Sequence, residues 1–246
     1  MSRLKNTWHY VRNNGVIPTL KHALYRISEL KNDRYFGIET NNDVKLESLG
    51  IHNGDSAQYS PISYAALKLA LREVEPLSGN EAFLDYGAGK GRVLIVAATL
   101  PFRRIVGVEF APELVSEARN NIERARHHLT DADIEILEAD ATEFDVPADI
   151  SVIHFYNPFF GKTLSTVTDN IANSLRTSPR KMTILFANAD DFERILHEEN
   201  HIPQNWITKT KDIPWPCFEQ DAPYSNSYRI YSLDSRQPAK PNPIKK

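Results

Sequence analysis

Short apolar runs alternate with stretches of helical periodicity along most of the chain. Residues 82–85, 105–109, 134–137 and 150–155 are compact apolar runs of strand length, and a fifth lies within residues 182–189. Between them, apolar residues recur every three or four positions, which is typical of helices with one buried face. Strands that alternate with helices predict a mostly parallel sheet with helices on both faces.

The pattern changes near the carboxyl end. A short helix is predicted around residues 192–196, and two further strands at 206–213 and 228–233, without a convincing helix between them. Consecutive strands without a crossover helix favour an antiparallel hairpin at one edge. The predicted fold is therefore α/β, a doubly wound and mostly parallel seven-stranded sheet with an antiparallel edge hairpin.

The amino-terminal part has a different pattern. Leu20, Leu24, Ile27 and Leu30 follow Pro18 at helical spacing, and residues 61–74 predict a helix that packs on two sides. We therefore expect a helical extension and lid over residues 1–75 and a ligand-binding domain over 76–235. The Pro-rich, basic segment 236–246 is expected to be a disordered tail.

Composition narrows the class of protein. The chain has 246 residues and a mix of apolar and charged residues that is ordinary for a globular protein with one main core. Its longest apolar run, residues 93–100, is too short to span a bilayer, and the start "MSRLKN" lacks the apolar stretch of a signal peptide. The expected location is the cytoplasm.

Net charge and cysteine content do not indicate a further binding or catalytic site. The formal net charge is −3, so nucleic acid is not an expected partner, although residues 1–34 hold seven Lys or Arg against two acids. The single cysteine, Cys217, excludes an internal disulfide and is expected to pack within "PWPCF". No His, Asp and Glu group has metal-binding spacing, so no metal is predicted.

The densest candidate site is the segment "FLDYGAGKGR". Gly87, Gly89 and Gly91 follow an apolar run at the point where a predicted strand turns into a helix. Ligands of open α/β sheets bind outside the carboxyl ends of the strands, where glycines let a ligand approach the backbone. The alternative is a tight turn without a ligand. Glu109, at the end of the next strand, is placed to accept hydrogen bonds from a ribose diol.

The glycine spacing distinguishes two cofactors. A dinucleotide fingerprint reads Gly-x-Gly-x-x-Gly, whereas this chain has Gly-x-Gly-x-Gly with Asp85 two positions ahead of it. A carboxylate there would repel a pyrophosphate and suits the ammonium of an amino-acid group. The pattern favours S-adenosylmethionine over NAD.

The segments "FLDYGAGKGR", "IVGVEF", "EADA" and "FYNPF" resemble, in order, the motifs of class I (seven-stranded, Rossmann-like) S-adenosylmethionine-dependent methyltransferases. The resemblance covers about residues 81–233. "GAGKGR" and "PFRRIVGVEFAPEL" also resemble a bacterial group distantly related to the non-SET histone lysine methyltransferases. The resemblance implies an enzyme that uses S-adenosylmethionine, releases S-adenosylhomocysteine, and binds the cofactor through Asp85, Gly87, Ala88, Gly89, Lys90, Gly91, Glu109, Phe110, Asp140, Ala141 and Asn157.

The segment "FYNPF" is the candidate for contact with the methyl acceptor. It resembles the Asn-Pro-Pro-aromatic motif of amine methyltransferases, which implies catalytic roles for Asn157, Pro158 and Phe159. The second proline is absent, which alters the backbone shape. The alternative is a turn that ends a strand, with Phe159 in the core. His154, three residues before Asn157, is expected to be a neutral, hydrogen-bonded histidine within the sheet packing.

Aromatic residues are the remaining candidates. Tyr35, Tyr59 and Tyr64 in the extension and Trp215 near the carboxyl end are expected to line the acceptor pocket. Alternatively, the tyrosines anchor the extension to the core. The adenine contact of Asp140 has a similar alternative, in which the residue is a solvated loop acid or a helix cap.

The predicted function is methyl transfer from S-adenosylmethionine to a nitrogen, for instance that of a protein lysine. Two alternatives stay open. One is an O-methyltransferase that acts on a sugar or another small metabolite. The other is a non-catalytic S-adenosylmethionine-binding adaptor whose basic amino-terminal segment binds a partner. The acceptor, protein or small molecule, and the oligomeric state are not determined by the sequence.

Overall fold

The structure is a computed structural model and describes residues 15–49, 54–74, 76–199, 201–215 and 227–238. Its centre is a seven-stranded sheet in the order β3-β2-β1-β4-β5-β7-β6. Strands β1 to β5 are parallel, and β7 is antiparallel to both of its neighbours. The predicted fold class is confirmed. The strands are β1 (Ala82–Tyr86), β2 (Arg104–Glu109), β3 (Asp133–Glu138), β4 (Ile150–Tyr156), β5 (Lys181–Ala187), β6 (Ile207–Pro214) and β7 (Ser227–Asp234).

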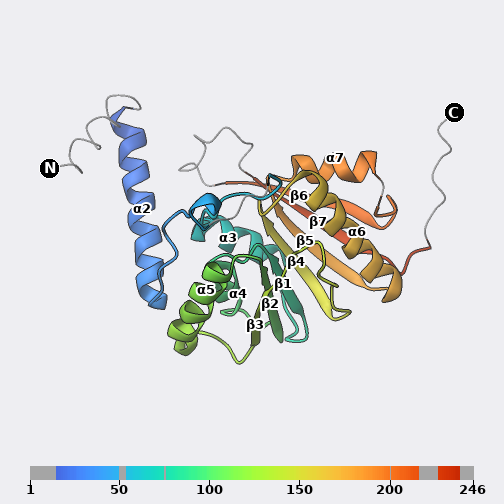
Figure 1. Cartoon of the computed structure of the whole chain (residues 1–246), viewed down its shortest axis with the longest axis horizontal. Helices are drawn as coiled ribbons and strands as arrows, with labels where there is room; N and C mark the ends of the chain where they lie inside the picture. The colour runs from blue at the N-terminus through green and yellow to red at the C-terminus, as the bar shows by residue number, and fades with distance from the viewer. Residues whose placement is uncertain (1–14, 50–53, 75, 200, 216–226, 239–246) are drawn as a thin grey trace.

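Helices cover both faces of the sheet (Figure 1). One face packs against α3 (Tyr64–Leu71), α4 (Arg92–Ala97) and α5 (Pro112–Ala125). The other packs against α6 (Gly161–Thr177) and α7 (Asp190–Glu198). Short 3₁₀ turns lie at Leu46–Leu49, Arg72–Val74 and Arg126–His128. Within the described residues no helix is both long enough and apolar enough to cross a bilayer.

Strand β1 runs through the middle of the sheet, and all five of its residues are buried. Because successive side chains of a strand point to opposite faces, Phe83 packs in the layer of α3 to α5 and Leu84 in the layer of α6 and α7. The chain passes from β1 outward to β2 and β3 and then returns to β4 on the other side of β1. The strand order therefore reverses between β1 and β4.

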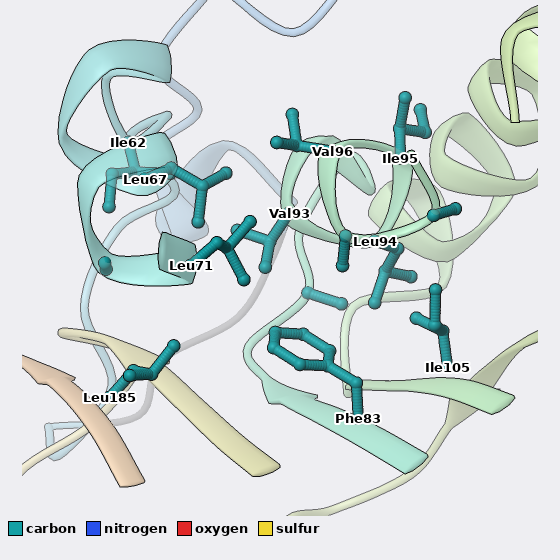
Figure 2. Close-up of a cluster of buried hydrophobic side chains, with 14 of the residues drawn as sticks. Ile62, Leu67, Leu71, Phe83, Val93, Leu94, Ile95, Val96, Ile105 and Leu185 are labelled. Atoms are coloured by element: carbon teal, nitrogen blue, oxygen red, sulfur yellow. The ribbon is translucent and has the colours of Figure 1, made fainter. Parts of the chain in front are cut away.

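The amino-terminal extension shares the core of the sheet domain. Leu67 and Leu71 of α3 lie beside Val93 of α4, above Phe83 and Ile105 of the sheet (Figure 2). Leu67 has no exposed surface, and Leu71 is almost as fully buried. The predicted boundary near residue 75 therefore crosses one continuous hydrophobic cluster.

Helix α2 (Val16–Phe36) forms where it was predicted and ends at Gly37, which has a left-handed backbone. It stands at one edge of the molecule (Figure 1). Its predicted apolar stripe does not pack, because Leu20, Leu24, Ile27 and Leu30 are each about half exposed. The residues that α2 buries are Glu29, Asp33 and Phe36. Hydrophobic spacing thus located the helix but not the side that faces the protein.

The two closing strands form the predicted antiparallel pair, with β7 between β5 and β6. Strand β7 has buried residues such as Tyr228, Ile230 and Leu233, whereas no residue of β6 is fully buried. The edge strand carries Lys209 and Lys211. Charged side chains on an edge strand oppose pairing with another sheet.

Candidate functional site

A cleft lies at the carboxyl ends of β1, β2 and β4, where the strand order reverses. It encloses about 760 Å³, with the open space at its mouth included. In open α/β sheets this position collects the loops that bind ligands. Its lining comes from the strand ends and from the extension, and includes Asp85, Gly87, Ala88, Glu109, Phe110, Ala141, Asn157, Pro158 and Phe159 together with Ala57 to Ile62.

The glycine turn between β1 and α4 needs glycine at three positions. Gly87, Gly89 and Gly91 all have positive φ angles, which side chains rarely adopt. A Cβ atom on Gly87 would lie 2.5 Å from the Pro158 side chain, and one on Gly89 would lie 2.4 Å from the Tyr59 ring. The space beside both glycines is therefore taken by the protein itself. Gly87 lines the cleft, whereas Gly89 and Gly91 are not part of its lining.

Glu109 is held at the end of β2 by backbone amides. Its Oε2 accepts a hydrogen bond from the amide of Gly89 at 2.9 Å, and its Oε1 accepts from those of Phe110 and Ala111 at 3.1 and 3.0 Å. Burial raises the pKa of Glu109, and these three amides offset part of that rise. Within the described residues Oε2 accepts one hydrogen bond, so it retains acceptor capacity, and Glu109 lines the cleft.

Asp85 is buried at the end of β1 and lines the same cleft. Its Oδ1 lies 2.7 Å from Nδ1 of His154 on β4. Its Oδ2 is buried and has no hydrogen-bond partner among the described residues. Burial raises the pKa of Asp85, and the hydrogen bond from His154 works against that rise.

The segment after β4 closes the far side of the cleft. Asn157 has a φ of 45°, which asparagine tolerates better than most residues. Pro158 accepts a backbone hydrogen bond from Ala57 at 3.1 Å, which ties the turn to the extension. The Phe159 ring is buried against Tyr86 and Phe155 in edge-to-face contacts. All three residues after β4 line the cleft, and Phe159 also belongs to the core.

The extension supplies the remaining wall of the cleft through Tyr59. Its ring lies against Gly89, and the ammonium of Lys90 lies 5.5 Å from the ring centre. Its hydroxyl donates a hydrogen bond to the Thr40 carbonyl at 2.9 Å. Burial raises the pKa of Tyr59, so the hydroxyl remains a donor at neutral pH. Tyr59 thus packs the extension directly onto the glycine turn.

Other predicted site residues lie outside the cleft lining. Lys90 is paired with Glu117 on α5 at 2.9 Å. Asp140 is exposed, and its Oδ1 accepts hydrogen bonds from the backbone amide and hydroxyl of Thr142, as in a capped turn. Tyr35 is mostly exposed and packs on His128.

Tyr64 and Trp215 are buried outside the lining. The Tyr64 hydroxyl donates to Asp33 at 2.6 Å, which anchors α2 to α3. The Trp215 ring lies 5.8 Å from that of Tyr156, which does line the cleft. Residues 216–226, which include Cys217, lie outside the described residues, as do residues 239–246 of the predicted tail.

Arg92 is a cleft-lining residue that sequence reasoning missed. It begins α4 directly after Gly91, and its guanidinium binds Glu29 and Asp33 of α2 and the hydroxyl of Thr40. The signal in the sequence was an arginine at the head of an otherwise apolar helix, in "GRVLIVAA". A charge in a buried run requires a partner, but the sequence did not indicate which acids supply it.

Comparison with known proteins assigns the sheet domain. Residues 83–177 match the model of the family described as "Methyltransferase domain". Residues 83–177 are therefore assigned to a methyltransferase domain. The match spans β1 through α6 and therefore includes the glycine turn, Glu109 and the Asn157 turn. Among curated proteins, the ribosomal protein L11 methyltransferase of Thiobacillus denitrificans is 43% identical over 60 residues, which are 24% of this chain and 20% of that protein. The aligned part is thus one fifth of that relative's length.

Solved structures share the fold of the methyltransferase domain at low identity. A precorrin-6y C5,15-methyltransferase from Geobacter metallireducens superposes with a TM-score of 0.52 at 18% identity, over 73% of this chain and 93% of that one. A ribosomal protein L11 methylase from Lactobacillus delbrueckii gives a TM-score of 0.50 at 14% identity, over 69% and 77%. These likenesses show the fold of the domain, a seven-stranded sheet shared with solved methyltransferases.

The residues of the methyltransferase domain suit S-adenosylmethionine. Oδ2 of Asp85 is a buried acceptor without a partner in the described structure, and it can take a hydrogen bond from an ammonium. Glu109 has a free acceptor position for a hydroxyl of the ribose. Among the described residues, no cluster of three His, Cys, Asp or Glu side chains is arranged to hold a metal ion.

Proposed function

We propose that the protein is an S-adenosylmethionine-dependent methyltransferase that acts on a nitrogen acceptor, such as the amine of a protein lysine. One observation carries the choice of nitrogen. Asn157 lines the cleft together with Asp85 and Glu109, at the end of the strand that follows the reversal of strand order. An asparagine amide oxygen accepts a hydrogen bond from an amine N–H and thereby orients the nitrogen lone pair.

Each residue in the cleft has a role in this proposal. When bound, S-adenosylmethionine supplies an electrophilic methyl group on a sulfonium. Glu109 accepts hydrogen bonds from the ribose, and Asp85 pairs with the ammonium of the methionine part. Asn157 orients the acceptor, while Phe159 supports the turn from the core. Tyr59 forms the wall of the cleft that lies against the glycine turn.

A protein acceptor is supported by the curated relative. That protein's name says that it methylates ribosomal protein L11, and its aligned segment is 43% identical to this chain. The alignment covers only a fifth of the relative, so the family match assigns the domain, and the protein acceptor is our proposal. Fold likeness alone does not select a substrate, because class I methyltransferases with one fold serve many acceptors.

The decisive experiment is product analysis. The purified protein is incubated with methyl-labelled S-adenosylmethionine and fractionated cell extract, and the labelled products are identified by mass spectrometry. Methylation of an amine supports the proposal. A methyl ether or ester would establish the O-methyltransferase instead. Binding of S-adenosylmethionine without a labelled product in any fraction would favour the non-catalytic adaptor.

Asn157 has a matched control in Asn188. Both asparagines have positive φ angles, of 45° and 54°, and both directly follow paired residues of the parallel strands β4 and β5. Asn188 does not line the cleft. Glycine tolerates either backbone, so Asn157→Gly removes only the amide and should lower kcat about 100-fold with little change in cofactor affinity. Asn188→Gly should leave kcat unchanged. Equal kcat in the two variants would remove Asn157 from the mechanism.

A further inference from the structure

Three polar side chains form a hydrogen-bonded chain across the sheet, on the face covered by α3 to α5. Asp85 of β1 and His154 of β4 are register partners on adjacent strands. Their closest atoms, Oδ1 and Nδ1, are 2.7 Å apart. The other ring nitrogen of His154, Nε2, lies 2.6 Å from the hydroxyl of Tyr228 on β7. His154 and Tyr228 have no exposed surface, and Asp85 is 1% exposed.

The donors and acceptors of these three side chains decide which atom donates in each hydrogen bond. An ionised carboxylate only accepts, so Nδ1 of His154 carries the proton and donates to Asp85. In the tautomer with its proton on Nδ1, the ring accepts at Nε2 from the hydroxyl of Tyr228. The tyrosine thereby selects the tautomer of the histidine, and the histidine holds the aspartate in one orientation.

The hydrogen-bonded series of side chains ends in an acceptor, Oδ2 of Asp85, that has no donor within the described part of the fold. Oδ1 of Asp85 is bound by His154, whereas Oδ2 is buried without a partner. Asp85 is the member of the chain that lines the cleft. A buried acceptor without a donor costs free energy, which a ligand that brings a donor can recover.

The geometry points to Tyr228 and His154 as positioning residues that aim the free oxygen of Asp85 at the ammonium of the cofactor's amino-acid group. This inference rests on the proposed function, because it requires a cofactor of the S-adenosylmethionine type. It goes beyond that function by assigning a role to two residues that do not line the cleft and belong to no motif in the glycine turn. Tyr228 lies 143 positions after Asp85 in the sequence.

A purely structural role is the competing explanation. Phe83 stacks on His154 at a ring distance of 6.2 Å, so the imidazole is also part of the hydrophobic packing. A packing role predicts that substitutions weaken every ligand of the cleft equally, through loss of order. A positioning role predicts a loss confined to ligands with an amino group.

Two ligands separate these roles. S-adenosylhomocysteine carries the amino-acid group, and 5′-methylthioadenosine keeps the adenosine and the thioether but lacks that group. Calorimetric titration of both ligands into the full chain measures the contribution of the amino-acid group as the ratio of the two dissociation constants. The variants are His154→Leu, which removes the donor to Asp85, and Tyr228→Phe, which removes only one hydroxyl. His154→Asn serves as the conservative variant, because its amide can occupy the place of Nδ1.

The expected result is a selective loss. His154→Leu should weaken S-adenosylhomocysteine about 30-fold and Tyr228→Phe about fivefold, while 5′-methylthioadenosine changes by less than twofold in both. His154→Asn should restore much of the selectivity. Equal losses for both ligands, or no loss in Tyr228→Phe, would overturn the positioning role.

The mild Tyr228→Phe change keeps the experiment decisive if His154→Leu does not fold. If the unaltered protein binds neither ligand, the proposed function fails, and that outcome is distinct from a failure of the positioning role.

Discussion

Two buried polar networks meet the cleft, and they differ in whether their hydrogen bonds are complete. The first, which we call the docking network, consists of Arg92, Glu29, Asp33, Thr40 and Tyr64 and joins α2 to the start of α4. The second, which we call the cleft chain, consists of Asp85, His154 and Tyr228.

The docking network is close to saturated. The guanidinium of Arg92 donates to Glu29 and to the Ile62 carbonyl, both at 2.5 Å, and to Thr40 at 2.8 Å. It also lies over the Tyr64 ring, 4.3 Å from its centre. Each oxygen of Asp33 accepts at least one hydrogen bond. Asn41, which accepts from Arg92 at 2.9 Å, keeps a buried amide nitrogen without a partner among the described residues. The five residues of the docking network otherwise use their side-chain donors and acceptors on one another and on nearby backbone, which suits the network to holding two segments together.

The cleft chain has the opposite property. It is as deeply buried, yet its terminal oxygen on Asp85 has no partner among the described residues. Burial of an unpaired acceptor lowers the stability of the ligand-free protein. Completeness of hydrogen bonding, more than burial or charge, thus distinguishes the docking network from the cleft chain.

The largest predicted effect is on the docking network. Arg92→Met removes the only cation that the structure places against Glu29 within the described residues, and two acids remain buried in its place. We expect the free energy of unfolding to fall by about 3–5 kcal/mol in urea denaturation. Arg104→Met is the matched control, because Arg104 pairs with Glu135 and Asp149 near the surface and should cost less than about 1 kcal/mol. Similar losses in both variants would mean that burial of the pairs is unimportant.

The second-largest predicted effect concerns Glu109, and it is an effect on the affinity for the cofactor product. Glu109→Gln keeps the shape of the side chain but replaces a charged acceptor of three backbone amides by a neutral amide. We expect the dissociation constant of S-adenosylhomocysteine to rise by about tenfold to 100-fold, from a loss of roughly 1.5–3 kcal/mol. Calorimetric titration measures it. An unchanged affinity would contradict the ribose contact.

A smaller effect of the opposite sign is predicted at Asp85. Asp85→Asn keeps an acceptor for His154 and removes the buried charge, so the free energy of unfolding at neutral pH should increase by about 1 kcal/mol. The same variant should bind S-adenosylhomocysteine more weakly. Thermal or urea unfolding measures the stability, and calorimetric titration measures the binding of S-adenosylhomocysteine. If Asp85→Asn were less stable than the unaltered protein, the unpaired carboxylate of the cleft chain would not be the source of a stability cost.

The dependence of folding stability on pH follows from the direction in which the pKa of Asp85 is shifted. Because the pKa of Asp85 in the folded state is raised above its ordinary value of 3.8, the folded protein holds that proton more tightly than the unfolded chain. This contribution to stability is fully present below pH 3.8 and is lost as the pH rises through the raised pKa. In Asp85→Asn the decline over that window should be smaller than in the unaltered protein.

The smallest effect is predicted on the outer face of α2. Leu24 is 54% exposed, whereas Leu67 on α3 has no exposed surface. Leu24→Ala should therefore change the free energy of unfolding by less than about 0.5 kcal/mol, and Leu67→Ala should lower it by about 2–5 kcal/mol. A large loss for Leu24→Ala in urea denaturation would show that α2 packs on its apolar side.

Much of the fold could be predicted because it depends on short-range patterns. The predicted runs coincide with all seven strands to within one or two residues, since alternation of strand and helix is written in local hydrophobicity. The orientation of α2 was not predictable in this way. Its apolar spacing favoured burial of Leu20 and Leu24, but Glu29 and Asp33 face the protein because Arg92, about 60 positions away, requires acids.

The candidate site divides in the same manner. The glycine turn, the acid at the end of β2 and the Asn157 turn could be predicted from the sequence, because each is a local motif at a strand end and parallel strands bring such ends to one edge. The contact of Tyr59 with Gly89 and the link from Tyr228 through His154 to Asp85 are visible in the folded protein alone. The physical reason is that hydrogen bonds and close contacts across a sheet depend on strand order and register, which bring together residues that no spacing along the chain relates.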